Sequence, residues 1–177
     1  EPHVEKMREQ GGVYVSRDHQ DRELVPVNVY YPEEYKGDPD CYIFFTKQMQ
    51  LADVLKRCHA FFKPTQYAFT CMNVMWHVEK LLNYFAPEKL IAGTALVATV
   101  LNGPGDVDFI GARGAGTMNL ANYTEKPDDF THKLVTELEK AQFNPTLTTN
   151  FKGTLMAKFV FNSVVNTLCT MFEMTMG

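Results

Sequence analysis

The stretch "CYIFFTKQMQLADVLKRCHAFF" (residues 41–62) joins a short apolar run to a helical pattern, and it decides the fold class. The run "CYIFF" is continuous and of strand length, which is typical of a strand buried on both faces of a parallel sheet. In residues 50–62 the apolar side chains recur at helical spacing, so they share one side of a helix. A buried strand followed by an amphipathic helix predicts a βαβ unit.

The same alternation continues downstream. Residues 66–72, "QYAFTCM", repeat the pattern of a buried strand, and residues 77–85, "HVEKLLNYF", repeat the helical one. Residues 90–101, "LIAGTALVATVL", form a third apolar strand region. Strands that alternate with short helices predict an α/β domain with a mainly parallel sheet.

The segments around this core have weaker patterns. Residues 3–12 resemble the end of a helix closed by glycines, and residues 13–31 alternate like one or two short strands around a polar turn. Residues 102–123 are glycine-rich and alternating, which predicts a meander or hairpin at a sheet edge. Within them, "GARGAG" (111–116) lacks the glycine spacing of a dinucleotide-binding loop, so a twisted hairpin is favoured over a phosphate loop.

A second amphipathic helix follows the glycine-rich segment, with Asp128 or Asp129 as its predicted N-cap. Residues 144–153 then connect to a final helix, and the composition changes there. We therefore predict one domain over residues 1–148 and the start of a second over residues 149–177.

Composition and charge exclude several classes of function. The net charge of −4 gives no broad electropositive surface, so neither a nucleic-acid partner nor an anionic membrane is expected. The longest apolar run, 90–101, is shorter than the roughly 20 residues of a spanning helix, so no membrane segment is expected. The cysteines show no metal-ligand spacing, which predicts reduced thiols in a cytoplasmic protein without a metal site. They are Cys41, Cys58, Cys71 and Cys169.

A polar stripe runs along the final helix, in "MAKFVFNSVVN" (156–166). Lys158, Asn162 and Asn166 recur every four residues on an otherwise apolar helix, so they stack along one side. Buried polar groups need partners, and protein groups would suffice for a single pair. A row of three favours a small anionic ligand, because an ammonium can protonate a carbonyl while amides hold hydroxyl and carboxylate oxygens.

Further polar residues follow the first two predicted strands. Lys47 and Gln50 come just after the first strand, and Asn73 comes just after the second. In open α/β sheets the ligand crevice lies outside the carboxyl ends of the strands. Taken singly, each residue is more typical of a solvated loop or a helix cap, and their agreement with the stripe gives them weight.

These residues together resemble the ketopantoate reductase family, which comprises 2-dehydropantoate 2-reductases and related D-2-hydroxyacid dehydrogenases. The resemblance covers nearly the whole chain. "YIFFTKQMQ" is similar to the family's strand with its cofactor-contacting Lys and Gln, and "CMNVMWH" to its Asn-Gly-x-Gly-His turn. "NGPGDVDFIG" resembles its glycine-rich hairpin, and "KFVFNSVVN" its lysine followed by two asparagines at the start of a helical second domain.

The resemblance implies a Rossmann-like domain, lacking its first strands here, followed by the first helix of an all-α domain. The implied reaction reduces a 2-keto acid by hydride from NADPH, with ketopantoate as the leading substrate on the way to pantothenate. Lys158 would be the general acid, and Asn162 and Asn166 would hold the hydroxyl and carboxylate. Lys47 and Gln50 would contact the NADP cofactor, and Asn73 would lie between cofactor and substrate. A D-2-hydroxyacid dehydrogenase acting on branched or aromatic 2-keto acids is the alternative.

The sequence also departs from the family pattern. The opening strand, the G-x-G-x-x-G loop and the basic residue that reads the 2′-phosphate are absent, as is the catalytic glutamate of the helical domain. We therefore expect a chain truncated at both ends, with poor cofactor binding of its own and self-association through uncovered apolar surface. Val74 and Trp76 occupy the turn's two glycine positions, and Trp76 is expected to plug the site. These departures support a second hypothesis, a non-catalytic binding or assembly module on the same scaffold.

Overall fold

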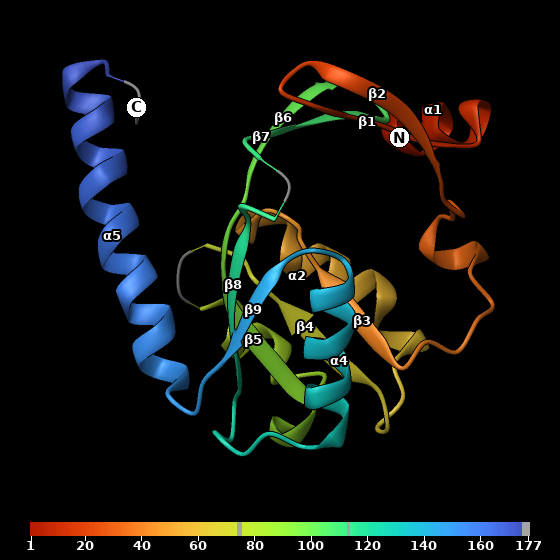
Figure 1. Cartoon of the computed structure of the whole chain (residues 1–177). Coiled ribbons are helices and arrows are strands. Elements are labelled where there is room, and N and C mark those ends of the chain that lie inside the picture. Colours follow the sequence, from red (N-terminus) through yellow and green to blue (C-terminus); the bar gives the residue numbers. More distant parts are fainter. Residues whose placement is uncertain (74–75, 113, 175–177) are drawn as a thin grey trace.

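The computed structural model of the chain describes residues 1–73, 76–112 and 114–174, and Figure 1 shows its arrangement. The helices are α1 (Pro2–Gln10), α2 (Gln48–Cys58), α3 (His77–Leu81), α4 (Asp129–Lys140) and α5 (Phe151–Phe172), with short 3-10 turns η1 (Pro32–Glu34), η2 (His59–Phe61) and η3 (Pro87–Lys89). The strands are β1 (Gly12–Arg17), β2 (Gln20–Pro26), β3 (Cys41–Phe44), β4 (Tyr67–Thr70), β5 (Leu90–Leu96), β6 (Ala98–Gly103), β7 (Asp106–Ile110), β8 (Thr117–Asn122) and β9 (Asn144–Leu147).

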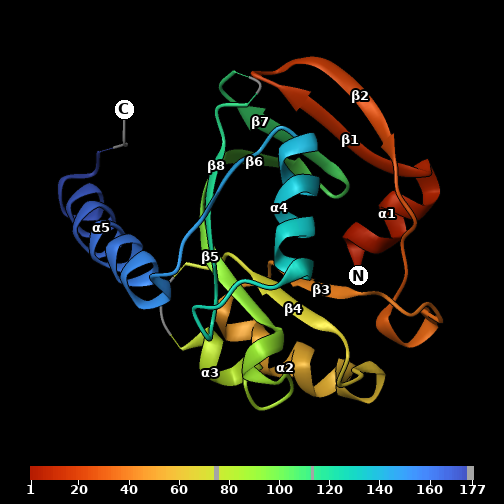
Figure 2. The ribbon, with the colours of Figure 1, turned by 60° about the horizontal axis from the view of Figure 1, so that its bottom comes forward.

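The main sheet has the order β3-β4-β5-β8-β9. Strands β3, β4 and β5 are parallel, β8 runs antiparallel to β5, and β9 runs parallel to β8. Helices α2 and α3 cover one face of this sheet and α4 covers the other (Figure 2). The structure thus confirms an α/β fold whose main sheet is mostly parallel, as the alternating apolar runs predict.

Two apolar clusters fill the layers on either side of the main sheet. Leu51 and Leu55 of α2 are fully buried on one face, where Phe151 and Leu155 of α5 also pack. On the other face, Leu134 and Leu138 of α4 pack against Phe69 and Leu120 of the sheet. Because the sheet is covered on both faces, its central strands read as continuous apolar runs.

A second, four-stranded sheet with the order β2-β1-β7-β6 stands beyond the carboxyl ends of β3, β4 and β5, at the top of Figure 1. Strands β1 and β2 form a hairpin through Asp18 and His19, whose φ angles are 48° and 63°. Positive φ at both loop residues is what a type I′ turn requires. Strand β1 also pairs in parallel with β7, although the two are 92 residues apart in sequence. We call this unit the small sheet.

Three details of the predicted strands are wrong. The apolar region 90–101 is two strands in different sheets, because the chain leaves the main sheet at Leu96, which is 58% exposed, and enters the small sheet at Ala98. The segment 102–123 forms the β6–β7 hairpin as expected, but β8 lies inside the main sheet rather than at an edge. The predicted connector 144–153 contains strand β9, whose Pro145 is tolerated because β9 is an edge strand.

The amino-terminal end of α4 is held by Asp128, which confirms one of the two predicted N-caps. Asp128 Oδ1 accepts hydrogen bonds from the backbone N–H of Thr131 at 2.9 Å and from its hydroxyl at 2.8 Å, and Oδ2 accepts one from the Tyr67 hydroxyl. The Tyr67 ring in turn stacks on Phe130, with 3.9 Å between the centroids. One carboxylate therefore joins α4 to the start of β4.

Replacing Asp128 with alanine should lower the free energy of unfolding by about 2 kcal/mol, since it removes the cap and leaves Tyr67 without its acceptor. Burial raises the pKa of Asp128, but the hydrogen bonds from Tyr67 and Thr131 outweigh that effect and leave the pKa lowered. A lowered folded pKa stabilises the protein above the unfolded value, about 3.9, and this contribution is lost as pH falls through the folded pKa. Urea titrations at pH 7 and pH 3 measure both effects.

Asp129→Ala is the matched control, because Asp129 is exposed at the next position and caps no N–H in the structure. The capping account would be contradicted if both variants lost the same free energy of unfolding. It would also be contradicted if the loss in Asp128→Ala were the same at pH 3 as at pH 7.

Helix α5 projects from the body of the molecule (Figures 1 and 2). Only its first turns are buried, and large apolar side chains are exposed along the rest. They are Val160, Phe161, Val164, Leu168, Met171 and Phe172. By length and composition alone, α5 is long and apolar enough to cross a membrane. The sequence-based expectation of no membrane segment rested on residues 90–101 and not on this helix. The criterion is weak evidence, because helices covered by other protein segments also meet it.

Candidate functional site

A cleft of about 750 Å³ lies where the main sheet, the small sheet and α5 meet. Its floor is the β5–β6 junction, one wall comes from β1, β2 and β7, and the other wall is α5. The polar residues that line it are Ser16, Arg17, Asp21, Glu23, Asn73, Gln142, Lys158, Asn162 and Asn166. The apolar ones include Val15, Leu96, Val97, Phe109, Ile110 and Phe143.

The polar stripe of α5 faces this cleft. Lys158, Asn162 and Asn166 all line it, and so does Asn73 from the loop after β4. The side of α5 that reaches the cleft is set by its first turns, where Phe151 packs against the main sheet. Four of the six residues selected from the sequence are thus brought together by the fold, although their chemical roles remain predictions.

Lys158 is the partly buried cation of the stripe. Burial lowers the pKa of its ammonium group. Its Nζ lies 5.8 Å from the centroid of the Phe161 ring on the same helix. No carboxylate forms an ion pair with Lys158 in the part of the chain that the structure describes. An ammonium that is partly desolvated and unpaired gives up its proton more readily than a free lysine.

Lys47 and Gln50 lie outside the lining of the cleft. Both are exposed at the start of α2, where Gln50 Oε1 accepts a hydrogen bond from the backbone N–H of Lys47 at 3.4 Å. The backbone N–H of Gln50 donates to the Lys47 carbonyl at 2.9 Å. In this structure the pair therefore shapes the first turn of α2, and its contact with a cofactor stays a prediction.

Trp76 does not plug the cleft, contrary to the sequence-based expectation. Its side chain is 64% exposed and is not part of the lining. Its φ of 70° lies in the left-handed region, which explains why a glycine suits this position in the resembled motif. Val74, the other residue at a glycine position, lies outside the described residues.

The small-sheet wall was missed by sequence reasoning. Its Asp108 is fully buried and accepts hydrogen bonds from Ser16 Oγ at 2.7 Å and from the backbone N–H of His19 at 3.2 Å. The Ser16 bond is the main cause of the lowered pKa of Asp108, against the opposing effect of burial. This cluster locks β1 and the turn after it onto β7. In the sequence, only Asp108 signals this cluster, as an aspartate among the apolar residues of the glycine-rich segment 102–123.

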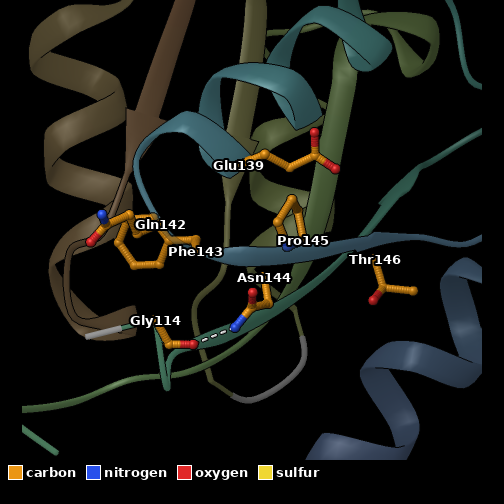
Figure 3. Close-up of a pocket in the computed structure, with 7 residues that line it drawn as sticks. All are labelled: Gly114, Glu139, Gln142, Phe143, Asn144, Pro145 and Thr146. Carbon is orange, nitrogen blue, oxygen red and sulfur yellow. Dashed lines mark hydrogen bonds between the residues drawn. The ribbon is translucent and has the colours of Figure 1, made fainter. Parts of the chain in front are cut away.

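A smaller hollow of about 480 Å³ adjoins the cleft at the end of α4 (Figure 3). Asn144 bridges it by donating hydrogen bonds from Nδ2 to the carbonyls of Gly114 and Gly116. Glu139 is the one carboxylate in its lining. The hollow shares Gln142 and Phe143 with the main cleft, so we treat it as an extension of that cleft.

The described residues suit the nicotinamide half of a dinucleotide better than the rest of it. Asn73 lines the cleft near the carboxyl ends of the parallel strands, where dinucleotides bind in such sheets. The sequence contains no G-x-G-x-x-G turn for the pyrophosphate. For metals, the described residues bring together no group of three or more His, Cys, Asp or Glu side chains.

Comparison with known proteins agrees with this geometry. The 2-dehydropantoate 2-reductase of Streptococcus pyogenes serotype M6 is 26% identical over 177 residues, which is all of this chain and 56% of the relative. Among solved structures, D-mandelate dehydrogenase with NADH and anilino(oxo)acetate shares the fold at a TM-score of 0.86 and 23% identity, covering 97% of this chain and 54% of that one. The 2-dehydropantoate 2-reductase of Geobacter metallireducens GS-15 shares the fold at a TM-score of 0.80 and 22% identity, and the match covers 93% of this chain and 54% of that one.

The chain therefore spans about half the length of the curated relatives that it matches. Residues 1–125, which include both sheets up to the end of β8, match the family described as ketopantoate reductase PanE/ApbA. The fold, the cleft and this match lead to one conclusion: the chain belongs to the ketopantoate reductase family.

Proposed function

We propose that this chain carries the substrate side of a reductase that converts a 2-keto acid to a 2-hydroxy acid with hydride from NADPH. Ketopantoate is the leading substrate, and pantoate, a precursor of pantothenate, the product. The observation that carries the proposal is the joint lining of one cleft by Lys158, Asn162, Asn166 and Asn73. The bound nicotinamide would supply the hydride, and the chain's own residues would bind the acid and supply the proton.

Each residue of the stripe has a distinct task in this proposal. The Lys158 ammonium donates a hydrogen bond to the keto oxygen and transfers its proton as that oxygen becomes an alkoxide, and the lowered pKa favours the transfer. Asn162 and Asn166, one and two turns further along α5, hold the hydroxyl and a carboxylate oxygen through their amides. Asn73 reaches the same space from the sheet side, between substrate and cofactor.

A D-2-hydroxyacid dehydrogenase acting on branched or aromatic 2-keto acids is the second candidate. Two observations favour it: the apolar side chains of Phe109, Ile110 and Phe143 in the cleft, and the fold shared with D-mandelate dehydrogenase. NADPH oxidation over a panel of ketopantoate, 2-ketoisocaproate and benzoylformate separates the two. Turnover of ketopantoate at least tenfold above the others supports the first candidate, and turnover of only the branched or aromatic acids excludes it. The same panel with NADH identifies the preferred nicotinamide.

A non-catalytic binding module remains the candidate from another class. Its support is the positive φ of Trp76, a bulky residue in a conformation that favours glycine. Restoring glycine at both Val74 and Trp76 should raise cofactor affinity if these two residues are what impairs the site. An unchanged affinity would show that their bulk does not block cofactor binding.

We further propose that residues 149–177 begin a helical domain and that the protein is a cytoplasmic homo-oligomer. The exposed apolar side of α5 supports self-association, and the four free thiols fit a reducing compartment. Burial raises the pKa of the Cys41 and Cys71 thiols to about 12, so both are unreactive at neutral pH. Sedimentation of the protein as a single monomeric species would contradict self-association.

A further inference from the structure

Arg17, on the small-sheet wall of the cleft, has a charge to which neither the sequence motifs nor the family resemblance gives a role. It is the last residue of β1 and lines the cleft on a different wall from Lys158. Both cations therefore line one cleft, Arg17 from the small sheet and Lys158 from α5.

The guanidinium of Arg17 is held in place before any ligand arrives. Its Nη1 donates a hydrogen bond to the Gly111 carbonyl at 2.7 Å, and its central carbon lies 5.5 Å from the centroid of the Phe109 ring. The backbone N–H of Gly111 donates in turn to Asp18 Oδ1 at 2.8 Å. Because the same glycine is bonded to Arg17 and to its neighbour, the side chain loses little further freedom when it binds a ligand.

Among the residues that the structure describes, no ion pair neutralises the charge of Arg17. Asp21 and Glu23 line the same cleft, but neither forms an ion pair with Arg17. The buried Asp108 lies close enough for Arg17 to help lower its pKa, yet its oxygens already accept hydrogen bonds from Ser16 and His19. Arg17 thus makes one hydrogen bond within the described residues, and its remaining N–H groups are available to a ligand.

Arg22, on the neighbouring strand, shows the contrast. Its guanidinium donates to Asp106 Oδ2 at 2.9 Å and stacks 3.6 Å from the centroid of the Tyr14 ring, and it does not line the cleft. Arg22 therefore has the partners of a structural arginine, and it serves as a matched control for Arg17.

We propose that Arg17 binds the carboxylate of the 2-keto acid and selects carboxylates over neutral analogues, an inference that rests on the function proposed above. A carboxylate has two oxygens and about four acceptor positions, so the Asn162 and Asn166 amides leave positions for an arginine on the opposite wall. The guanidinium fork matches the carboxylate plane, and a charged hydrogen bond of this kind contributes more than a neutral one.

The test compares two ligands that differ only at the acid group. Binding of 2-ketoisovalerate and of its primary amide is measured by NMR titration of the full chain and of the variants Arg17→Gln, Arg17→Lys and Arg22→Gln. We expect Arg17→Gln to weaken binding of the acid about tenfold or more, the loss of one charged hydrogen bond, and binding of the amide less than twofold. Arg17→Lys keeps the charge, so its affinity for the acid should lie between those of the wild type and Arg17→Gln. Arg22→Gln should bind both ligands as tightly as the wild type does.

The outcomes separate this inference from the proposed function. Equal losses for acid and amide, or no loss for either, overturn the role of Arg17 while keto-acid binding by the wild type leaves the reductase proposal standing. A wild-type chain that binds neither ligand overturns both. If Arg17→Gln weakens binding of NADPH but not of 2-ketoisovalerate, the arginine serves a cofactor phosphate, and the inference is wrong.

Discussion

Replacing Lys158 with methionine should lower kcat for 2-keto acid reduction by about 10²–10⁴-fold, the usual contribution of a positioned general acid. Methionine keeps the length and the apolar stem of lysine, so packing along α5 is retained while the proton donor is lost. KM should change much less than kcat, because Asn162 and Asn166, which line the same cleft and are proposed to hold the substrate, are kept in the variant. Steady-state kinetics on purified wild type and variant measures both constants.

The pH profile gives an independent test of the same residue. A general acid must be protonated, so kcat should fall as pH rises through the pKa of Lys158. Since burial lowers that pKa below the ordinary value of 10.5, the fall should begin at lower pH than for a free lysine. Lys152→Met, at an exposed position of the same helix outside the cleft, should leave kcat and the profile unchanged. A Lys158→Met variant with near wild-type kcat would show that the proton comes from elsewhere.

Replacing Gly93 with alanine should destabilise the protein by about 3 kcal/mol or more, since the added methyl has no room in the main sheet. A Cβ at this position would lie 2.0 Å from the carbonyl oxygen of Asn119 and 3.2 Å from Cα of Leu120. Both belong to the backbone of β8, which pairs with β5 on this side, so no side-chain rotation relieves the clash. The free energy of unfolding from urea titration measures the loss.

Gly103→Ala is the control, because Gly103 also lies in a strand but a Cβ there meets no atom within 4 Å. It should change the free energy of unfolding by less than about 1 kcal/mol, in the range of ordinary glycine replacements. Similar stabilities for the two variants would mean that β5 and β8 can move apart at Gly93. If Gly93→Ala failed to fold while Gly103→Ala folded normally, the expected destabilisation at Gly93 would also be supported.

The sequence was sufficient to predict the buried strands and the polar stripe. Ile91 and Phe69 lie in strands covered on both faces, which leave continuous apolar runs, and four-residue spacing places Lys158 and Asn162 on one side of any helix. These features depend on local pattern alone. The α/β fold could therefore be inferred before the structure, whereas placing Asn73 near the stripe also needed the general rule that ligands bind at the carboxyl ends of parallel strands.

The remaining features depend on pairings between distant segments, which local pattern does not encode. Nothing near Val97 signals that the chain changes sheets there, since both flanking segments are apolar. Strand β9 was missed because Pro145 and its polar neighbours have little strand propensity, and its parallel pairing with β8 outweighs that propensity. Arg17 reaches the cleft only because β1 pairs with β7.

The pairing of β1 with β7 also fixes the order in which parts of the protein can fold during synthesis. The β1–β2 hairpin leaves the ribosome before β7, and its buried Ser16 lacks the Asp108 carboxylate until that residue, 92 positions later, has been made. At about 5–20 residues per second, the hairpin waits roughly 5–18 seconds with one edge of β1 unpaired. During this interval the edge of β1 is open to pairing with other nascent chains. The wall that carries Arg17 is thus completed only after β3, β4 and β5 have all been synthesised.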